Sequence, residues 1–252
     1  MIDSPTKNTS PKSTSASGAN GSAQAKEGFE KMRAATAEAA TVMKNSYSTA
    51  VQGAQNYQAK VMEFANSNTE SAFEFAQKAI SLDNTNEAAY SVLSWLYATK
   101  RQFEKAIAES ERAISLNPNS AESYMRLGLV LAYAGRAEEG IPYMQNALRL
   151  NPFPSPNYFS NLAMIYCESG HYEKAIEAAK RALQSEPNSP IPYTTLAISY
   201  IRLGQEEEAR AAVAEVRRTN PKSSLDGYAK RAPFTQAQLE RNIEDLRKAG
   251  LK

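Results

Sequence analysis

Residues 121–152 read AESYMRLGLVLAYAGRAEEGIPYMQNALRLNP, and this stretch decides the fold. It contains two runs of helix-forming residues, separated by Ala134-Gly135-Arg136 and followed by Asn151-Pro152. In both runs the apolar residues recur at the three- and four-residue spacing of one helix face. Glycine between the runs and proline after the second are typical of helix ends. The stretch therefore predicts two helices packed as a hairpin.

The same hairpin pattern occurs four times in the second half of the chain. Successive copies end at prolines 34, 35 and 34 residues apart, namely Pro118, Pro152, Pro187 and Pro221. The first helix of each copy carries large packing residues, among them Tyr90, Leu93, Tyr97, Tyr124, Leu127, Tyr166 and Tyr200. The second helix carries small ones, among them Ala106, Ala113, Ala147, Ala175, Ala182 and Ala209. A single hairpin cannot bury its own apolar face, so four copies predict an all-α solenoid with a continuous core.

This period and these residues resemble the tetratricopeptide repeat, whose arrays bind other proteins. The resemblance implies an array over residues 79–223, with repeats at about 87–120, 121–154, 156–189 and 190–223. Ala72 to Leu82 is expected to form the second helix of a preceding half repeat. Residues 224–252 are expected to cap the array, and Thr235 with Gln238 three residues later predicts a capping box at the start of the last helix.

A narrower likeness concerns the arrays at the C-terminal end of some bacterial adenylate/guanylate cyclase-type proteins. It rests on three segments, residues 132–136, 150–154 and 246–251. In those proteins the cyclase domain lies upstream, and no segment of this chain is long enough to form one. We therefore do not expect cyclase activity, although a detached regulatory module that partners a nucleotide cyclase is one alternative.

The inner face of such an array is formed by first-helix positions that lie between the packing residues. The candidates for a peptide-binding groove on this face are Trp95, Met125, Leu129, Tyr133, Met164, Ile198 and Arg202. Because the set is mostly apolar, it favours a peptide or helix as ligand, with Trp95 and Tyr133 as anchors. Paired Lys and Asn residues that would clamp a terminal carboxylate are missing from these positions. The alternative is that the chain's own N- or C-terminal helix covers part of this face.

Two different regions precede the array. Residues 1–24 have almost no apolar side chains, so we expect a disordered tail. Residues 25–78 lack proline and are rich in alanine, which predicts a long amphipathic helix or a helix pair. Its apolar row has a mean spacing of about 3.5 residues, as in a coiled coil. The candidates for a face that contacts a granule or a partner helix are Phe29, Met32, Met43, Tyr47, Tyr57, Val61 and Phe64.

The same region resembles the N-terminal part of phasins, proteins that coat polyhydroxyalkanoate storage granules. The resemblance rests on residues 28–30, 39–43, 47–50, 53–57 and 68–78 and covers about 50 residues. It implies attachment to granules or self-association. Phasins continue as helix beyond the Phe73-Glu74-Phe75-Ala76 segment, whereas in this chain the repeats begin there.

No motif in the sequence predicts catalysis. His171 is the only histidine and Cys167 the only cysteine, so neither has the partners that a metal site or a nucleophile requires. We interpret His171 as a turn residue and Cys167 as a small buried side chain. The sequence contains no phosphate-binding loop and no dinucleotide fingerprint. The chain is therefore expected to be non-enzymatic, with no catalytic, metal or cofactor-binding residues.

Charge and hydropathy limit the partners and the compartment. The net charge of +2 gives no field that would hold nucleic acid, and no apolar run reaches the roughly 20 residues of a membrane span. The start does not read as a signal peptide, so we expect a cytoplasmic protein. The main hypothesis is a phasin-like granule-associated or self-associating protein with a repeat scaffold. The alternative is a general cytoplasmic adaptor whose N-terminal helix forms homo-oligomers.

Overall fold

The computed structural model describes residues 69–252, with side chains from Ala72 onward. This part of the chain is entirely helical, as predicted. Its helices are α2 (Thr69–Leu82), α3 (Glu87–Thr99), α4 (Phe103–Leu116), α5 (Ala121–Tyr133), α6 (Ala137–Leu150), α7 (Pro156–Glu168), α8 (Tyr172–Ser185), α9 (Pro190–Arg202), α10 (Glu206–Thr219), α11 (Leu225–Arg231) and α12 (Gln236–Lys248). The expected tail, most of the expected N-terminal amphipathic region and its seven face candidates lie outside the described residues.

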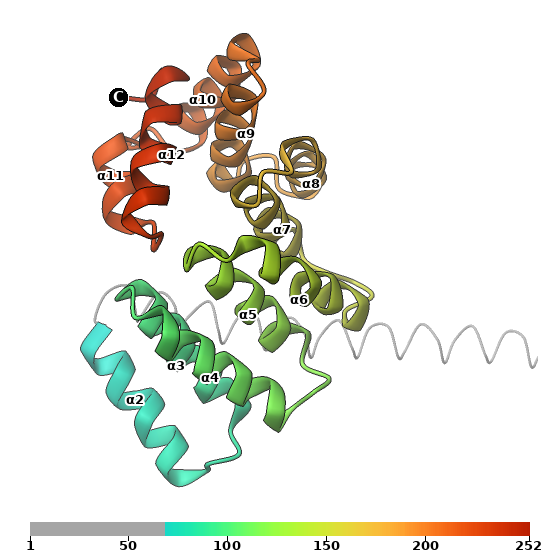
Figure 1. Ribbon diagram of the computed structural model, residues 1–252, viewed down its shortest axis with the longest axis vertical. Coiled ribbons are helices and arrows are strands. Elements are labelled where there is room, and N and C mark those ends of the chain that lie inside the picture. Colours follow the sequence, from blue (N-terminus) through green and yellow to red (C-terminus); the bar gives the residue numbers. More distant parts are fainter. Residues whose placement is uncertain (1–68) are drawn as a thin grey trace, which may run out of the picture. The chain divides into compact units, whose positions relative to one another are not determined.

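The helices form a solenoid of hairpins (Figure 1). The pairs α3/α4, α5/α6, α7/α8 and α9/α10 each pack as a hairpin, and every hairpin contacts the next. The first helices also contact one another in order, α3 with α5, α5 with α7 and α7 with α9. The first helices therefore lie side by side along one face of the stack, which confirms the predicted all-α solenoid.

The four hairpins share one turn geometry. The turn after each first helix contains a residue in the left-handed region, Gly135, Gly170 and Gly204 with φ between 74° and 85°, and Arg101 with φ of 55°. In the second hairpin, the amide of Arg136 donates to the Leu131 carbonyl at 2.8 Å, and the other three turns repeat this bond. Glycine adopts this conformation without a Cβ clash. The strained turn is therefore the one after α3, where Arg101 carries a Cβ at this position.

Small residues allow the two helices of a hairpin to approach closely. Ala106, Ala147 and Ala175 are fully buried. Gly128 on α5 faces Gly140 on α6, and a Cβ on Gly140 would lie 2.5 Å from the Gly128 carbonyl oxygen. Large apolar residues such as Leu96, Leu127 and Ile165 fill the space between hairpins, and burying each contributes about 1.5–3 kcal/mol. The predicted small residues therefore belong to the core. Of the predicted large ones, only Leu93 and Leu127 are buried, whereas the five tyrosines are half-buried, namely Tyr90, Tyr97, Tyr124, Tyr166 and Tyr200.

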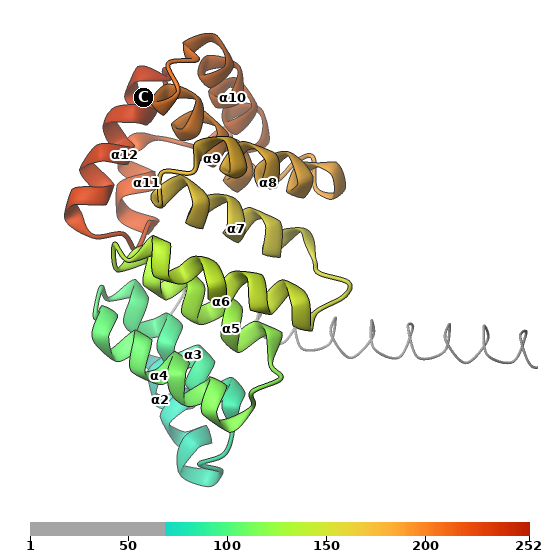
Figure 2. The ribbon, with the colours of Figure 1, turned by 45° about the vertical axis from the view of Figure 1, so that its right-hand side comes forward.

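Additional helices pack at both ends of the four hairpins (Figure 2). At the first end, Ala72 and Ala76 of α2 pack on Leu93 and Leu96 of α3, as expected for a half repeat, although α2 begins at Thr69 rather than Ala72. At the other end, α11 and α12 form a short pair, and α12 packs on α9. The predicted capping box at the start of α12 is present, with the Thr235 side chain accepting from the Gln238 amide.

Candidate functional site: an apolar pocket on the inner face

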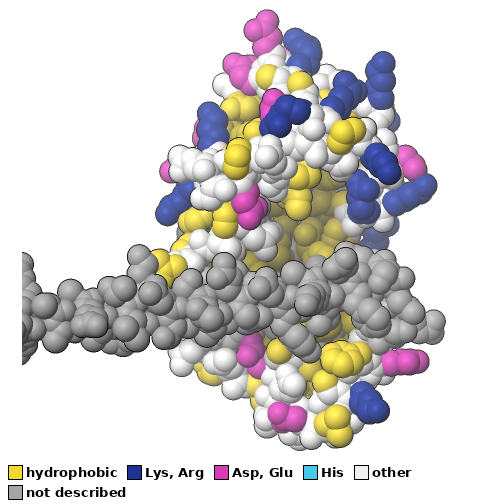
Figure 3. Space-filling view, turned by 180° about the vertical axis from the view of Figure 1, so that it is seen from behind, with side chains coloured by type: hydrophobic (Ala, Val, Ile, Leu, Met, Phe, Trp, Pro, Cys, Tyr) yellow, Lys and Arg dark blue, Asp and Glu magenta, His cyan; other side chains and the backbone are white. Residues whose placement is uncertain are grey.

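A pocket of about 380 Å³ lies between the first helices of the array and the C-terminal helix pair. Its walls come from α3, α5, α7, α9 and α10 on one side, and from α11, the 232–234 turn and Leu251 on the other. Most of its lining is apolar or aromatic. The space-filling view shows hydrophobic side chains deep in a hollow on one face of the described unit (Figure 3). This size and lining are typical of ligand-binding pockets.

Four of the seven groove candidates line this pocket, namely Trp95, Tyr133, Met164 and Ile198. Met125 and Leu129 are instead core residues, with only 3% and 4% of their surface exposed. They face into the stack because α5 packs against both α3 and α7. The seventh candidate, Arg202, contacts the chain's own helix α12, as described below.

An aromatic cluster connects the array to the C-terminal segment. The rings of Trp95 and Tyr133 meet edge to face at 6.1 Å, and Tyr133 meets Phe234 edge to face at 5.2 Å. Phe234 in turn lies 6.4 Å from the ring of Tyr228 on α11. Such edge-to-face pairs contribute about 0.5–1.5 kcal/mol beyond their area burial. Burial raises the pKa of the Tyr133 hydroxyl to about 12, so this residue is neutral at physiological pH.

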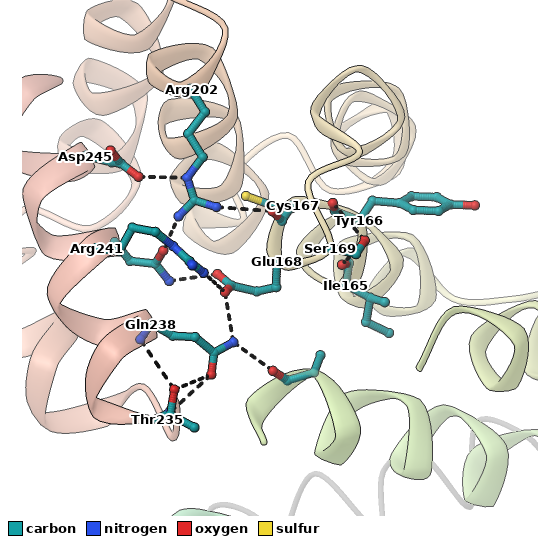
Figure 4. Close-up of polar contacts among 12 residues, drawn as sticks. Ile165, Tyr166, Cys167, Glu168, Ser169, Arg202, Thr235, Gln238, Arg241 and Asp245 are labelled. Atoms are coloured by element: carbon teal, nitrogen blue, oxygen red, sulfur yellow. Dashed lines mark hydrogen bonds and ion pairs between the residues drawn. The ribbon is translucent and has the colours of Figure 1, made fainter. Parts of the chain in front are cut away.

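Beside the pocket, α12 covers part of the inner face through polar contacts centred on Glu168 (Figure 4). The Glu168 side chain is only 2% exposed. It accepts hydrogen bonds from Gln238 Nε2 at 2.9 Å, Arg241 Nη2 at 2.9 Å and Asn242 Nδ2 at 2.8 Å. Gln238 Nε2 also donates to the Ala132 carbonyl at 2.9 Å. These contacts fix α12 to the ends of α5 and α7, because an unpaired buried carboxylate would be costly.

A second polar contact holds α12 against α9. Arg202 Nε lies 2.8 Å from Asp245 Oδ2, and both side chains are only about a tenth exposed. Arg202 also donates to the Asn242 side chain and to the Cys167 carbonyl. The C-terminal helix therefore occupies the surface around Arg202. At this end of the inner face the structure corresponds to the alternative in which the chain's own C-terminal helix covers part of the groove.

The single cysteine is buried beside these contacts, and the single histidine lies outside the pocket. Burial raises the pKa of the Cys167 thiol to about 11, so it stays protonated and unreactive at neutral pH. His171 lies at the surface, where its Nε2 is 3.2 Å from Glu138 Oε2. Within residues 69–252, no group of three or more potential metal-binding side chains comes together. No helix in this range is long and apolar enough to span a membrane.

Several pocket residues were missed by the sequence analysis, namely Glu168, Ile191, Tyr228, Arg231 and Phe234. Three of them belong to the 224–252 segment, which was interpreted only as a cap. The available signal was the presence of two large aromatic residues, Tyr228 and Phe234, in this segment. Ile191 follows Pro190 at the start of α9 and is 58% exposed, which is unusual for a large apolar side chain.

Comparison with known families identifies the repeats. Residues 87–120, 119–188 and 166–231 each match a sequence family described as tetratricopeptide repeat. Together with the helical hairpins and their left-handed turns, these matches show that the solenoid is built from tetratricopeptide repeats. Among curated proteins, no match was found.

Solved structures share the fold at low sequence identity. PilW, a widely conserved type IV pilus biogenesis factor, is 21% identical, with a TM-score of 0.60 over 79% of this chain and 89% of that one. A thermophilic TPR protein of Thermus thermophilus is 20% identical, with a TM-score of 0.57 over 77% and 99%. MamA is 22% identical, with a TM-score of 0.50 over 64% and 94%. At these identities the likeness concerns the fold alone, and the comparisons lend no support to the phasin or cyclase resemblances.

Proposed function

We propose that this protein is a non-enzymatic scaffold of the cytoplasm that binds a peptide or short helix of a partner protein in the apolar pocket. The observation that carries the proposal is the position of the pocket. It lies on the face formed by the first helices of a tetratricopeptide repeat array, and the aromatic side chains Trp95, Tyr133 and Phe234 contribute to its lining. Buried aromatic residues in well-packed pockets dominate the energetics of protein interfaces.

The local geometry favours an extended or helical segment over a large flat interface. Contacts made by α12 already occupy the inner face around Glu168 and Arg202, so the apolar surface that remains is concentrated in the pocket. The side chain of Ile191, which lines the pocket and is exposed to solvent, continues this apolar surface. A partner would therefore insert a few apolar side chains, and the surrounding polar contacts would hold the pocket in shape.

The exposed position of Ile191 allows a test with little risk of unfolding. Substituting Ile191→Glu places a charge on the apolar wall and should reduce binding of the partner at least tenfold, because a charge without a counter-ion is costly in an apolar contact. The matched control is Leu82→Glu, which changes an equally apolar and 79% exposed side chain on α2. Tagged full-length proteins would be compared by quantitative affinity purification from the source cells. Recovery of the same amount of partner by both variants and by the unchanged protein would refute the proposal.

A second candidate function rests on the phasin resemblance of residues 28–78. In this interpretation, Phe29, Met32, Met43, Tyr47, Tyr57, Val61 and Phe64 attach the chain to polyhydroxyalkanoate granules or to a second copy. The other interpretations are an adaptor that oligomerises through this region and a module that partners a separately encoded nucleotide cyclase. These proposals rest on sequence alone, because the seven residues lie outside the described part of the chain.

The packing of α2 on α3 decides where a deletion should end. Removing residues 26–66 leaves the whole of α2, whereas a deletion that extends to residue 78 would remove contacts of Ala72 and Ala76 with the array. If the N-terminal region is the attachment site, the shortened protein should no longer co-sediment with isolated granules. Light scattering of both forms would show whether the same residues are needed for oligomers. Co-sedimentation that persists after the deletion would contradict granule attachment through this region.

A further inference from the structure

We infer that the segment bound in the pocket carries an acidic residue beside its apolar side chains, and that Arg231 receives this carboxylate. The inference rests on the proposed function and adds the chemistry of the partner. It follows from the charged groups that line the pocket, because the one carboxylate among them is already hydrogen-bonded whereas the one cation is exposed and unpaired within the described residues.

The one carboxylate in the lining cannot attract a cationic ligand. Glu168 already accepts hydrogen bonds from Gln238, Arg241 and Asn242, all of them on α12. Its charge is partly neutralised by Arg241, and its side chain is almost completely buried. A lysine or arginine of a partner would have to displace these bonds, so Glu168 holds the C-terminal helix rather than a ligand.

The hydroxyl groups in the lining are also largely occupied. Thr194 and Thr195 donate to carbonyls of the first turn of α9, and Ser223 donates to the Asn220 carbonyl. The Ser224 hydroxyl accepts the Gly227 amide at the start of α11. These groups are engaged in capping or within their own turns, so they offer little to a ligand.

Three hydrogen-bond donors in the lining have no acceptor within residues 69–252, namely the Trp95 indole, the Tyr228 hydroxyl and the Arg231 guanidinium. Trp95 Nε1 is buried and has no hydrogen-bond partner among residues 69–252. The Tyr228 hydroxyl accepts from Asn242 Nδ2 at 3.2 Å, which leaves its own hydrogen free to donate. Arg231 is exposed at the end of α11, lines the pocket, and makes no ion pair within the described residues. A ligand that supplies acceptors, above all a carboxylate, complements this set.

The other charges around α11 do not cancel that of Arg231. The acidic residue of α11, Asp226, pairs with Lys230 at 2.7 Å. On the facing helix α12, Asp245 pairs with Arg202. Arg231 therefore remains the uncompensated charge in the pocket lining. It lies beside an apolar surface that includes Ile191, Phe234 and Leu251, so the complementary ligand combines apolar side chains with a negative charge.

The test is a selection of randomised 12-residue peptides displayed on phage against the full-length protein. The unchanged protein should enrich peptides with at least two large apolar residues and with Asp or Glu, and should deplete Lys and Arg. Arg231→Glu should reverse this charge preference, because it replaces the receiving cation with a carboxylate. Lys230→Glu is the matched control, since it makes the same charge change one residue away on a side chain that does not line the pocket.

One enriched peptide without tryptophan is then measured in solution. Trp95 is the only tryptophan in the chain, so its fluorescence reports binding at the pocket directly. Arg231→Glu should lower the affinity for an acidic peptide about tenfold or more, as expected for loss of a charge-assisted hydrogen bond. An Asp→Asn change in the peptide should also lower its affinity for the unchanged protein.

The possible outcomes separate this inference from the proposed function. The inference would be overturned, and the proposed function left standing, by either of two results. In the first, binding of the apolar peptides depends on Ile191 but shows no charge preference. In the second, Arg231→Glu selects peptides with the same charge preference as the unchanged protein. Enriched peptides whose binding is unchanged in Ile191→Glu, or a complete lack of enrichment, would overturn both. Reversal by Arg231→Glu but not by Lys230→Glu would support both.

Discussion

The junction between α5 and α6 and the junction between α12 and the array are built in opposite ways. At the first, Gly128 and Gly140 bring two backbones together, and the surrounding contacts are apolar. At the second, the buried side chains Glu168, Arg202, Asn242 and Asp245 make an ion pair and hydrogen bonds between residues 40 to 74 positions apart. The first junction belongs to a repeated pattern, whereas the second occurs once in the described part of the chain.

The two junctions are expected to respond differently to substitution. Apolar packing between the two helices of a hairpin loses stabilising free energy in proportion to the volume that is changed, and the surrounding helices can partly adjust. A buried polar junction depends on complete pairing, because removing one partner leaves the other charge without water or a counter-ion. The C-terminal junction is therefore expected to be the more sensitive of the two.

The largest expected effect is at Arg202. Substituting Arg202→Ala leaves the Asp245 carboxylate buried and unpaired, so the free energy of unfolding should fall by about 3–5 kcal/mol. Arg210→Ala is the control, because it removes an ion pair with Glu206 whose side chains are 55% and 66% exposed. That change should cost less than about 1 kcal/mol. Urea unfolding would give both values, and hydrogen exchange would show whether α12 is released first. Similar costs for the two variants would contradict the difference between the junctions.

An intermediate effect is expected at Gly140. In Gly140→Ala the new Cβ would lie 2.5 Å from a backbone oxygen of α5, so the hairpin must open, at a cost of about 1–3 kcal/mol. Gly227→Ala is the control, since the atoms nearest to its Cβ belong to the side chains of Ser224 and Arg231, which can move. Thermal unfolding should distinguish the two. No loss of stability in Gly140→Ala would show that the backbones need not approach so closely.

The smallest expected effect has the opposite sign. Arg101 occupies the left-handed position that glycine holds in the other three hairpin turns. Arg101→Gly should therefore raise the free energy of unfolding by about 0.5–1 kcal/mol, since relief of strain exceeds the entropy cost of glycine. Gly204→Ala is the reverse experiment, because its Cβ would meet no atom within 4 Å and only the backbone conformation is strained. Denaturant unfolding of both variants would test the pair, and a loss of stability in Arg101→Gly would refute the common turn geometry.

Much of the fold could be predicted because the repeat signals are local. The spacing of prolines, the alanines of the second helices and the Thr235–Gln238 capping box depend on contacts within one hairpin or one helix turn. The same signals placed Trp95, Tyr133, Met164 and Ile198 on the inner face, and all four line the pocket. The half repeat at the start was predicted for the same reason, with an error of three residues in the first residue of α2.

The rest of the site could not be predicted because it depends on contacts distant in sequence. Met125 and Leu129 have the periodicity of groove residues, yet their burial follows from how tightly α5 packs between α3 and α7. The periodicity of α9 places Arg202 on the inner face, but it gives no sign that Asp245 approaches it from α12. Tyr228, Arg231 and Phe234 carry no repeat signature, so their position in the pocket was not evident from the sequence.

By itself, the sequence determined the helices, the hairpins and the order in which the repeats stack, because these follow from periodic apolar burial and from residues that end helices. Only the tertiary structure decided that the C-terminal helix pair folds back onto the inner face, joins it through a buried ion pair and hydrogen bonds, and encloses an apolar pocket. The physical reason is that stacking is repeated between neighbouring hairpins, whereas the pairing of Glu168 and Arg202 with α12 is a single long-range arrangement. These polar residues carry no sequence signal of their pairing, because they lie far apart along the chain.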